Sequence, residues 1–498
     1  MNQHALRLRR LGIDTYRQPV VYMRDDCHVC RSEGFEAQAL IEVSGGGRQI
    51  LAVLNVITSD LLGHEEVSLS DVAWSAFGAQ EGERVTLRHP PTLESFSHVR
   101  AKMYGQRLDD AAFAEVVGDI AAGRYSDAHI AAFLTAGAGN RLDVGEMTSL
   151  TRAMLGTGER LRWDAPVVLD KHCVGGLPGN RTTPIVVAIV AAAGFTIPKT
   201  SSRAITSPSG TADTMETLCP VDLDVPAMRR VVEREGGCVV WGGAMRLSPV
   251  DDLLIRVEKP LDIDSDGQLV ASILSKKAAA GATHVLLDLP VGPTSKVRSP
   301  EAAAVLARDL VEVGRAMGLT VNAVQTDGTQ PVGRGVGPAL EALDVLAVLQ
   351  GVPEAPSDLR ERALLVAGGV LDLAPGAPAG SGCRIASEIL ADGRAWRKFQ
   401  AICEAQGGLR VPPVARHRRD VVAERAGRVI AIDNRRLARV AKLAGAPHSP
   451  AAGLIFHAPI GTAIALGQPL YTLHADAPGE LEYALAYALL HPHLVQVA

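Results

Sequence analysis

The chain has 498 residues, and 47% of them are hydrophobic, which predicts about three domains with sizeable cores. The net charge of −5 comes from well-mixed charges and aromatic residues make up only 4%, so a nucleic-acid-binding surface is disfavoured. No apolar run is long enough to span a membrane, the N-terminus does not resemble a secretory signal, and seven scattered cysteines predict reduced thiols in the cytoplasm.

Residues 1–90 are predicted to form a separate β-rich module. Short apolar or alternating segments indicate strands at 20–23, 39–43 and 49–54. Cys27 and Cys30 flank His28 and Val29, but one such pair without a second is weak evidence for a metal or redox site. We interpret them as two ordinary thiols.

A helical domain is predicted over 95–163. Apolar residues recur at helical spacing over 108–123 and 126–138, and Ser126 and Thr148 are predicted N-caps. From 164 to 410 strands and helices alternate, which predicts a mostly parallel α/β domain, with part of 255–300 returning to the helical domain. The predicted strands lie at 167–169, 239–241, 284–289 and 320–324, and a helix lies at 300–317.

Residues 411–498 are predicted to form a C-terminal α+β domain. Strands at 428–432 and 454–458 and a strand-turn-strand pattern over 460–473 resemble the small β-sandwich of biotinyl and lipoyl carrier modules. Those modules carry a modifiable lysine in a hairpin, whereas this segment has no lysine after Lys442. A structural cap is therefore favoured over a carrier role.

The stretch from Asp170 to Thr183 is the strongest functional signal in the chain. It predicts a strand, a glycine-rich turn and a helix that begins near Thr183. Glycines let backbone N–H groups approach an anion, the helix adds its positive end, and Lys171 and Arg181 supply cations. The glycine spacing matches neither a Walker loop nor a dinucleotide fingerprint. The pattern favours a phosphate cradle, although an ordinary strand-to-helix turn also fits it.

Two further constellations contain groups suited to a small polar ligand. Eight of the seventeen residues from Thr200 to Glu216 are Ser or Thr, so this loop is either a hydroxyl-lined phosphate site or a capped surface loop. Arg256 lies in a strand-like apolar run over 253–257, and Ser272 and Lys276 share one face of a predicted helix. Together they could bind the carbonyls and ring N–H of a flat heterocycle, or they could form a solvated charged surface.

Taken together, the three constellations resemble the thymidine/pyrimidine-nucleoside phosphorylase family. The matching motifs are Asp-Lys-His-x-x-Gly-Gly at 170–176, the Ser-Arg to Gly-Thr loop at 202–211 and Ser-Ile-Leu-Ser-Lys-Lys at 272–277. Three features make the chain similar to the longer type 2 branch of this family. Cys173 stands in place of a serine, the loop that follows has one extra residue, and an N-terminal module is present. That branch includes AMP phosphorylases and bacterial proteins regarded as thymidine phosphorylases.

The resemblance implies a pentosyltransferase that cleaves the N-glycosidic bond of a pyrimidine nucleoside by phosphorolysis, converting thymidine and phosphate into thymine and 2-deoxyribose 1-phosphate. Inorganic phosphate would be the co-substrate, and no metal or organic cofactor is expected. A nucleoside or nucleotide would be the partner, and a homodimer or higher homo-oligomer is expected. Asp264 would be the proton donor beside His172 and Lys171. Phosphate would be held by Lys171, Thr183 and Thr211. The remaining substrate contacts would be Gly176, Ser202, Arg203, Ala204, Ile205, Thr206, Ser207, Thr211, Arg256, Ser272, Lys276 and Lys296.

Three alternatives remain at the level of the sequence. A 5′-monophosphate phosphorylase would release ribose 1,5-bisphosphate and would need a second anion site, for which Arg203 and the serine-rich loop are available. A phosphoribosyltransferase would need metal-binding carboxylates, for which Asp251 and Asp252 are available. A non-catalytic nucleotide-binding protein would not need Lys171 and His172. The phosphate and base sites are also expected to lie on different domains that close over the substrate.

Overall fold

The computed structural model describes residues 5–16, 18–179, 181–204, 207–245, 247–261, 263, 265–376 and 380–498. Contacts divide the chain into two compact units. The first runs to Leu108 and includes residues 115–136, and the second contains residues 109–114 and 137–498. None of the described helices combines the length and apolarity that a membrane crossing requires.

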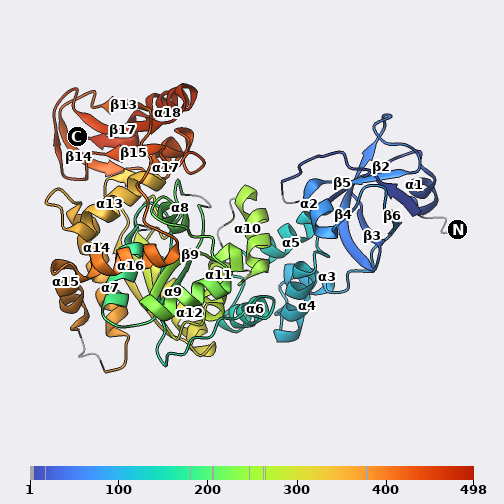
Figure 1. Ribbon diagram of the computed structural model, residues 1–498, viewed down its shortest axis with the longest axis horizontal. Coiled ribbons are helices and arrows are strands. Elements are labelled where there is room, and N and C mark those ends of the chain that lie inside the picture. The colour runs from blue at the N-terminus through green and yellow to red at the C-terminus, as the bar shows by residue number, and fades with distance from the viewer. Residues whose placement is uncertain are drawn as a thin grey trace. The chain divides into compact units, whose positions relative to one another are not determined.

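In the first unit, six strands close into a barrel in the order β1-β5-β2-β4-β3-β6, drawn in blue in Figure 1. Their side chains alternate between the barrel core and the outside, as the two-residue period of a strand requires. The strands and two short helices are β1 (Ala5–Leu8), β2 (Val20–Arg24), α1 (His28–Glu33), β3 (Leu40–Gly45), β4 (Arg48–Ile57), β5 (Glu66–Leu69), α2 (Asp71–Phe77) and β6 (Arg84–Arg88). The β-rich module and its three predicted strands are confirmed.

Cys27 and Cys30 are free, buried thiols at the start of α1. The Cys27 Sγ accepts a hydrogen bond from the Cys30 amide at 3.3 Å and so caps the helix. Burial raises the pKa of both thiols. Protonated thiols in an apolar core are poor metal ligands and nucleophiles, which agrees with the interpretation of two ordinary cysteines.

Four helices follow the barrel in sequence: α3 (Phe96–Met103), α4 (Asp110–Ala121), α5 (Asp127–Gly137) and α6 (Val144–Gly156). The predicted cap Ser126 is confirmed, because its Oγ accepts a hydrogen bond from the His129 amide at 3.3 Å. The prediction for Thr148 was wrong. Asp143 and Glu146 form a capping box that starts α6 earlier, and the Thr148 hydroxyl instead donates to the Val144 carbonyl at 2.7 Å.

The second unit is built on parallel strands, as predicted. They are β7 (Leu169–Cys173), β8 (Ile197–Ser201), β9 (Gly237–Trp241), β10 (His284–Val291) and β11 (Thr320–Asp327). One sheet has the order β11-β10-β7 and another pairs β8 with β9. A parallel bridge between Val168 and Thr196 links the two. The carboxyl ends of parallel strands meet at one edge, where ligands bind in such folds.

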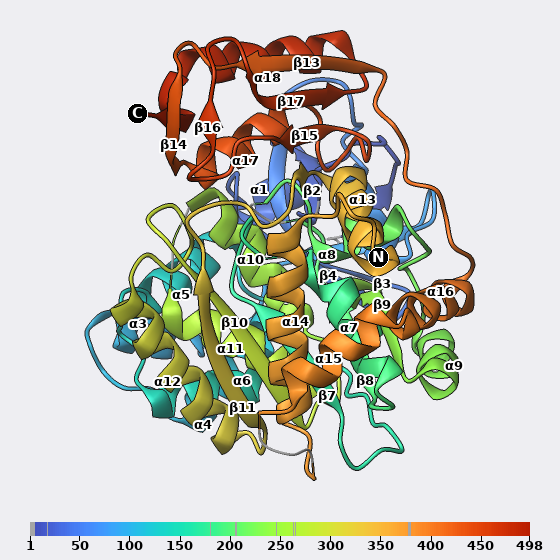
Figure 2. The same cartoon turned by 90° about the vertical axis from the view of Figure 1, so that its left-hand side faces the viewer.

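Helices cover both faces of this sheet. On β9, Val239 belongs to one core cluster while Cys238 and Val240 belong to another, and alternate strand residues point to opposite faces. Figure 2 shows α14, which packs against β10 and β7, in front of the strands. The helices are α7 (Thr182–Ala192), α8 (Thr211–Glu216), α9 (Val225–Glu235), α10 (Pro249–Leu261), α11 (Asp266–Ala279), α12 (Pro300–Ala316), α13 (Pro338–Gln350), α14 (Ser357–Asp372), α15 (Gly382–Ala391) and α16 (Arg394–Gln406).

The strand-like run around Arg256 is helical, so that prediction was wrong. The segment belongs to α10, whose buried residues include Val250, Leu254 and Val257. These positions follow the spacing i, i+4, i+7 of one helix face. The short window 253–257 concealed this period because it contains four apolar residues in five.

The C-terminal part is an α+β layer of two small antiparallel sheets, in the orders β12-β15-β17-β13 and β16-β14-β18. This agrees with the predicted fold class and with the predicted strands. Its elements are β12 (Gly335–Val336), β13 (His417–Val422), β14 (Gly427–Ile432), α17 (Asn434–Leu443), β15 (Gly453–Phe456), β16 (Ala463–Ile464), β17 (Pro469–Ala475), α18 (Pro478–Leu490) and β18 (Val495–Val497).

Candidate active site

The glycine-rich turn lies between β7 and α7, at the carboxyl end of a central strand. Asp170 to Cys173 lie within β7 itself, so the strand extends further into the motif than the apolar run indicated. Gly175 and Gly176 have φ angles of 110° and 69°, a region in which a side chain is strained. A Cβ on Gly175 would lie 3.0 Å from the Lys296 Cβ, so the turn lies against Lys296.

Lys171 is fully buried and connects the strand to the start of α7. Its Nζ donates to the Thr182 Oγ1 at 2.9 Å, and that hydroxyl donates to the Gly179 carbonyl at 2.8 Å. Burial lowers the pKa of Lys171, while the nearby Cys173 and Asp288 act in the opposite direction. An ammonium group is thus held next to the first residues of a helix, where backbone N–H groups are available to an anion.

A buried cluster of charges lies beside Lys171. Asp170 is 2.8 Å from the Lys277 Nζ and 3.5 Å from the Lys199 Nζ. Burial alone would raise the pKa of Asp170, but the two lysines reverse this and the net pKa lies below its usual value. Burial lowers the pKa of Lys199 well below the ordinary lysine value. Lys277 belongs to α11, so this ion pair attaches α11 to the second residue of β7.

His172 is held in its neutral form. Burial lowers its pKa well below the usual histidine value, and the positive charges of Lys277, Lys199, Lys276 and Lys171 add to the effect. A neutral imidazole carries one N–H donor and one acceptor nitrogen. At neutral pH it can donate a hydrogen bond to a carbonyl without bringing a full positive charge.

Cys173 and Asp288 lie directly against Gly179 in the loop that follows the glycine turn. A Cβ on Gly179 would lie 2.6 Å from the Cys173 Sγ and 3.3 Å from the Asp288 Oδ2, so only glycine fits here without a shift. Burial and the neighbouring Asp288 carboxylate raise the pKa of Cys173, which keeps the thiol protonated. The turn is further held by Arg362 of α14, which donates to the Pro178 carbonyl at 3.1 Å.

The serine-rich loop is closed by Asp213 of α8. The Asp213 Oδ2 accepts hydrogen bonds from the Ala204 amide at 2.7 Å and the Gly210 amide at 2.9 Å. A Cβ on Gly210 would lie 2.6 to 2.7 Å from backbone atoms of residues 202–204. The Ser207 hydroxyl donates to the Ser209 carbonyl at 2.8 Å. Ser202 is exposed and Thr211 is half-buried at the first position of α8.

Arg203 is bound within its own loop. Its guanidinium donates to the Glu216 Oε1 at 2.9 Å and contacts the Asp213 Oδ1 at 3.3 Å. It also lies over the Trp241 ring at 4.9 Å. The hydrogen bond to Glu216 is the main reason that the pKa of Arg203 is raised. Two carboxylates therefore already share its charge.

The residues predicted to face a base lie on α10 and α11. Lys276 donates to the buried Asp251 Oδ2 at 2.8 Å. Asp251, proposed from the sequence as a metal-binding carboxylate, is therefore already engaged by an ammonium group. Ser272, Lys276 and Arg256 are all half-buried. Asp264, Ile205 and Thr206 lie outside the described residues.

The structure brings the glycine turn, the start of α7 and the lysine end of α11 together through the contacts of Lys171 and Lys277. Sequence reasoning did not identify Lys199, Asp288 and Arg362 as parts of this region. The sequence does contain a signal for two of them: Lys199 lies inside the strand segment 197–201 and Asp288 inside the strand segment 284–291. Charged residues in buried strands are rare unless they are paired or functional.

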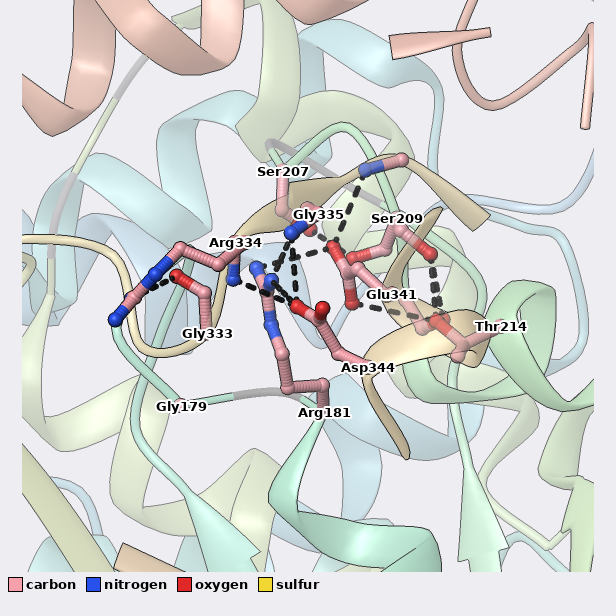
Figure 3. A network of polar contacts seen from close by, with 12 residues as sticks. Gly179, Arg181, Ser207, Ser209, Thr214, Gly333, Arg334, Gly335, Glu341 and Asp344 are labelled. Atoms are coloured by element: carbon pink, nitrogen blue, oxygen red, sulfur yellow. Dashed lines mark hydrogen bonds and ion pairs between the residues drawn. The ribbon is translucent and has the colours of Figure 1, made fainter. Parts of the chain in front are cut away.

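A second network, which links α7, α8 and α13, lies close to the turn (Figure 3). Arg181 is only 1% exposed and turns away from the glycine turn towards Glu341 and Asp344 of α13. It also donates to the Gly335 carbonyl. The sequence had suggested that Arg181 supplies a cation to the phosphate cradle, but its guanidinium is instead bound by these groups.

Two family models match the chain: "Glycosyl transferase family, helical bundle domain" over residues 97–158 and "Glycosyl transferase family, a/b domain" over residues 165–396. A Polaromonas protein named "Putative thymidine phosphorylase" is 64% identical over 100% of this chain and 97% of its own length. Proteins with the same name from Chelativorans and Legionella pneumophila are 58% and 57% identical, over 99% and 97% of this chain and 97% and 93% of theirs.

Among solved structures, anthranilate phosphoribosyltransferase from Thermus thermophilus superposes with a TM-score of 0.51. It is 22% identical and covers 62% of this chain and 99% of its own. At this identity the match concerns the fold alone, and it agrees with the observed arrangement of helices around a parallel sheet. With full-length relatives near 60% identity and both domain models matched in order, the chain belongs to the glycosyl transferase family that combines a helical bundle domain with an a/b domain.

Proposed function

We propose that this protein catalyses the phosphorolysis of a pyrimidine nucleoside, converting thymidine and inorganic phosphate into thymine and 2-deoxyribose 1-phosphate. The observation that carries the proposal is the buried Lys171, bonded to Thr182 at the start of α7 and followed directly by the neutral His172. An ammonium group and a hydrogen-bond donor therefore lie on consecutive residues of one strand, which supports the proposal. The names of the full-length relatives support the same reaction.

The phosphate is proposed to bind at the glycine turn. Lys171, the backbone N–H groups of the turn and the hydroxyls of Thr183 and Thr211 hold the dianion below C1 of the sugar. A phosphate oxygen then forms a bond to C1 as the C1–N bond to the base breaks, and the electron pair of that bond leaves with the base. The sugar becomes positively charged in the transition state, so an adjacent phosphate dianion stabilises it.

The base is proposed to be bound by His172, Arg256, Ser272 and Lys276. As the bond breaks, negative charge develops on the ring carbonyl oxygens, and hydrogen-bond donors aimed at these atoms stabilise the charge. The neutral His172 can donate through its N–H, and Lys276 retains two N–H groups besides the one directed at Asp251. Asp264 remains a proposed proton donor to the departing base, and inorganic phosphate needs no further cofactor as nucleophile.

A nucleoside is favoured over a 5′-monophosphate by the contacts of Arg203. A monophosphate carries a second anion, and Arg203 is the arginine that the sequence offered for it. Its guanidinium is neutralised by Glu216 and Asp213, so binding a phosphate there would require breaking a two-carboxylate arrangement. The second candidate function is therefore the phosphorolysis of AMP or another 5′-monophosphate, with ribose 1,5-bisphosphate as product.

A substrate panel tests the proposal directly. Thymidine, uridine, AMP, CMP and UMP are incubated with the purified protein and phosphate, and the release of free base and of the sugar phosphate is followed by chromatography. We expect thymidine to react with the highest kcat/KM. Turnover of AMP or CMP in preference to thymidine would transfer the proposal to the monophosphate reaction.

Two lysine variants provide the control for this assay. Lys171→Met keeps a long side chain but removes the ammonium group, and we expect it to lower kcat/KM by about 10²-fold or more, the size typical for one electrostatic contact to a transition state. Lys398→Met removes a half-buried lysine that pairs with Glu235 on α9 and should leave kcat/KM within about twofold. Equal activity of Lys171→Met and the unaltered protein would refute the assignment of the phosphate site.

The proposal extends to cellular location and assembly. All seven cysteines are free, which supports a reducing compartment such as the cytoplasm. A homodimer or a higher homo-oligomer is expected from the family resemblance. Light scattering coupled to size-exclusion chromatography measures the assembly, and a monomer at micromolar concentration would count against it.

A further inference from the structure

The buried network around Glu341 joins the two loops that the proposed reaction uses. Glu341 lies in the first turn of α13 and is only 3% exposed. Its carboxylate faces Arg181 on one side, with 3.5 Å between the Glu341 Oε1 and an Arg181 Nη. On the other side it accepts a hydrogen bond from the Thr214 hydroxyl at 3.3 Å.

Arg181 and Thr214 each belong to a segment that carries a proposed phosphate ligand. Arg181 directly precedes α7, two residues before Thr183. Thr214 lies in α8, three residues after Thr211. The Thr214 hydroxyl also lies 2.8 Å from the Ser209 hydroxyl, so this contact reaches into the serine-rich loop. Figure 3 shows Glu341 between Arg181 and Thr214.

Asp344 pairs with the other terminal nitrogen of the Arg181 guanidinium group. Its Oδ2 is 3.3 Å from the Arg181 Nη1 and accepts hydrogen bonds from the amides of Arg334 and Gly335, at 2.7 and 2.8 Å. A guanidinium group has a planar fork, so two carboxylates on one helix fix both its position and its orientation. Arg181 is therefore set by α13, not by solvent or by substrate.

We propose that Glu341 is a positioning residue that fixes the glycine turn and the serine-rich loop relative to each other, so that Thr183 and Thr211 can bind the same phosphate ion. The inference rests on the proposed function, because it concerns the binding of that phosphate. Glu341 acts through Arg181 and Thr214 and does not itself contact the ligand.

The energetics favour a positioning role over a stabilising one. Burying a charged pair costs desolvation energy that the pair only partly returns, so apolar residues of similar volume often stabilise a protein equally well. A buried arginine with two carboxylates is better suited to fixing a geometry. Small displacements between groups that must hold the same ion weaken the binding of that ion.

The test compares Glu341→Gln with Thr214→Val in the full-length protein. Glu341→Gln keeps the size of the side chain and, in buffer at about pH 8 where Glu341 is ionised, removes the charge that faces Arg181. Thr214→Val keeps the shape and removes the hydroxyl from the other side of the same link. We expect each variant to raise the dissociation constant of inorganic phosphate, measured by calorimetry, by about tenfold, the equivalent of one charged hydrogen bond. At saturating phosphate kcat should stay within about threefold, since the reacting groups are unchanged.

The double variant and a matched control make the test specific. If Glu341 and Thr214 act through one link, the double variant should weaken phosphate binding by less than the product of the two single effects. Glu235→Gln removes a half-buried carboxylate, which pairs with Arg234 and Lys398 at the end of α9. We expect it to bind phosphate within about twofold of the unaltered protein.

The outcomes separate this proposal from the proposed function. Binding of phosphate by both single variants at the unaltered strength, or equal weakening by Glu235→Gln, overturns the positioning role. If the unaltered protein binds phosphate but cleaves no nucleoside or nucleotide, the proposed function fails. The phosphate dissociation constants of the variants, compared with that of the unaltered protein, then still decide the role of Glu341. An unaltered protein that binds no phosphate overturns both.

Discussion

Single residues in this protein are held by contacts that their neighbours in sequence do not reveal. Lys171, Lys199 and Arg181 are all buried, and each is fixed by a partner that is distant in the chain or on another element. Burial favours a raised pKa in their carboxylate partners, but the net shifts of Asp170 and Glu341 differ in direction. Lysines keep the pKa of Asp170 below normal, whereas burial raises the pKa of Glu341 to about 7 despite Arg181.

The raised pKa of Glu341 makes stability depend on pH in a defined window. The unfolded chain releases this proton near pH 4.5 and the folded protein near pH 7. Between these values the folded state holds more protons, so its free energy of unfolding falls as the pH rises. This contribution falls by about 1.4 kcal/mol per pH unit, or roughly 3 kcal/mol over the window.

Urea denaturation of the unaltered protein and of Glu341→Gln at several pH values measures this contribution. The difference between the two unfolding free energies should decrease by about 2–3 kcal/mol from pH 5 to pH 7.5. Arg181 and Asp344 are the charged groups that act on Glu341, and both remain in the variant. A difference that does not change with pH would show that Glu341 is ionised throughout.

At the scale of elements, the apolar side chain of Leu177 attaches the glycine turn to the C-terminal sheets. Leu177 is 5% exposed and belongs to the same core cluster as Val336, Leu454 and Leu473. Leu177 lies one residue after Gly176, so the turn bearing the proposed phosphate site takes part in a core built mainly by residues 421–497. This gives the C-terminal layer a structural part in the site, as its predicted role as a cap suggests.

Truncation of this side chain should loosen the turn. We expect Leu177→Ala to lower the free energy of unfolding by about 2–4 kcal/mol, the usual cost of such a cavity, and to raise the KM for phosphate. Denaturant titration and steady-state kinetics measure the two effects. Leu466→Ala, at a 70% exposed position of the C-terminal layer, should change the unfolding free energy by less than about 0.5 kcal/mol. Equal effects of the two substitutions would rule out the attachment.

The elements themselves could largely be predicted, because hydrophobic period and caps are local signals. The strands 284–291 and 320–327 and the helix 300–316 follow from their apolar runs and from the Ser-Pro pair at 299–300. Errors arose where two local signals competed. Thr148 has the right chemistry for a cap, but Asp143 with Glu146 makes a capping box earlier in the chain. Arg256 lies in a run too short to distinguish the two periods.

The site could be predicted only in part, for a different reason. The motifs at 170–176 and 272–277 point to a charged ligand, and the Lys277–Asp170 pair does bring them together. Arg181, in contrast, pairs with Glu341 and Asp344, about 160 residues further along the chain. No local pattern distinguishes an arginine aimed at an anion from one bound by buried carboxylates, so its partners could be known only from the fold.

At the scale of the whole molecule, the N-terminal barrel has a core of its own. Every buried residue of its main cluster lies between Leu6 and Leu87. A domain with its own core can fold alone, so residues 1–90 as an isolated fragment should unfold cooperatively on heating and give a dispersed amide spectrum by NMR. Amide signals confined to the narrow range of unfolded chains would contradict this.

The closure of the barrel also restricts how it can associate. Each of its six strands is hydrogen-bonded to a neighbour on both sides, so the ring offers no strand edge to another chain. A second molecule cannot extend this sheet, and exchange of a strand would first require the ring to open. Any assembly through the barrel must therefore use side chains on its outer surface, which makes it sensitive to salt and to single surface substitutions.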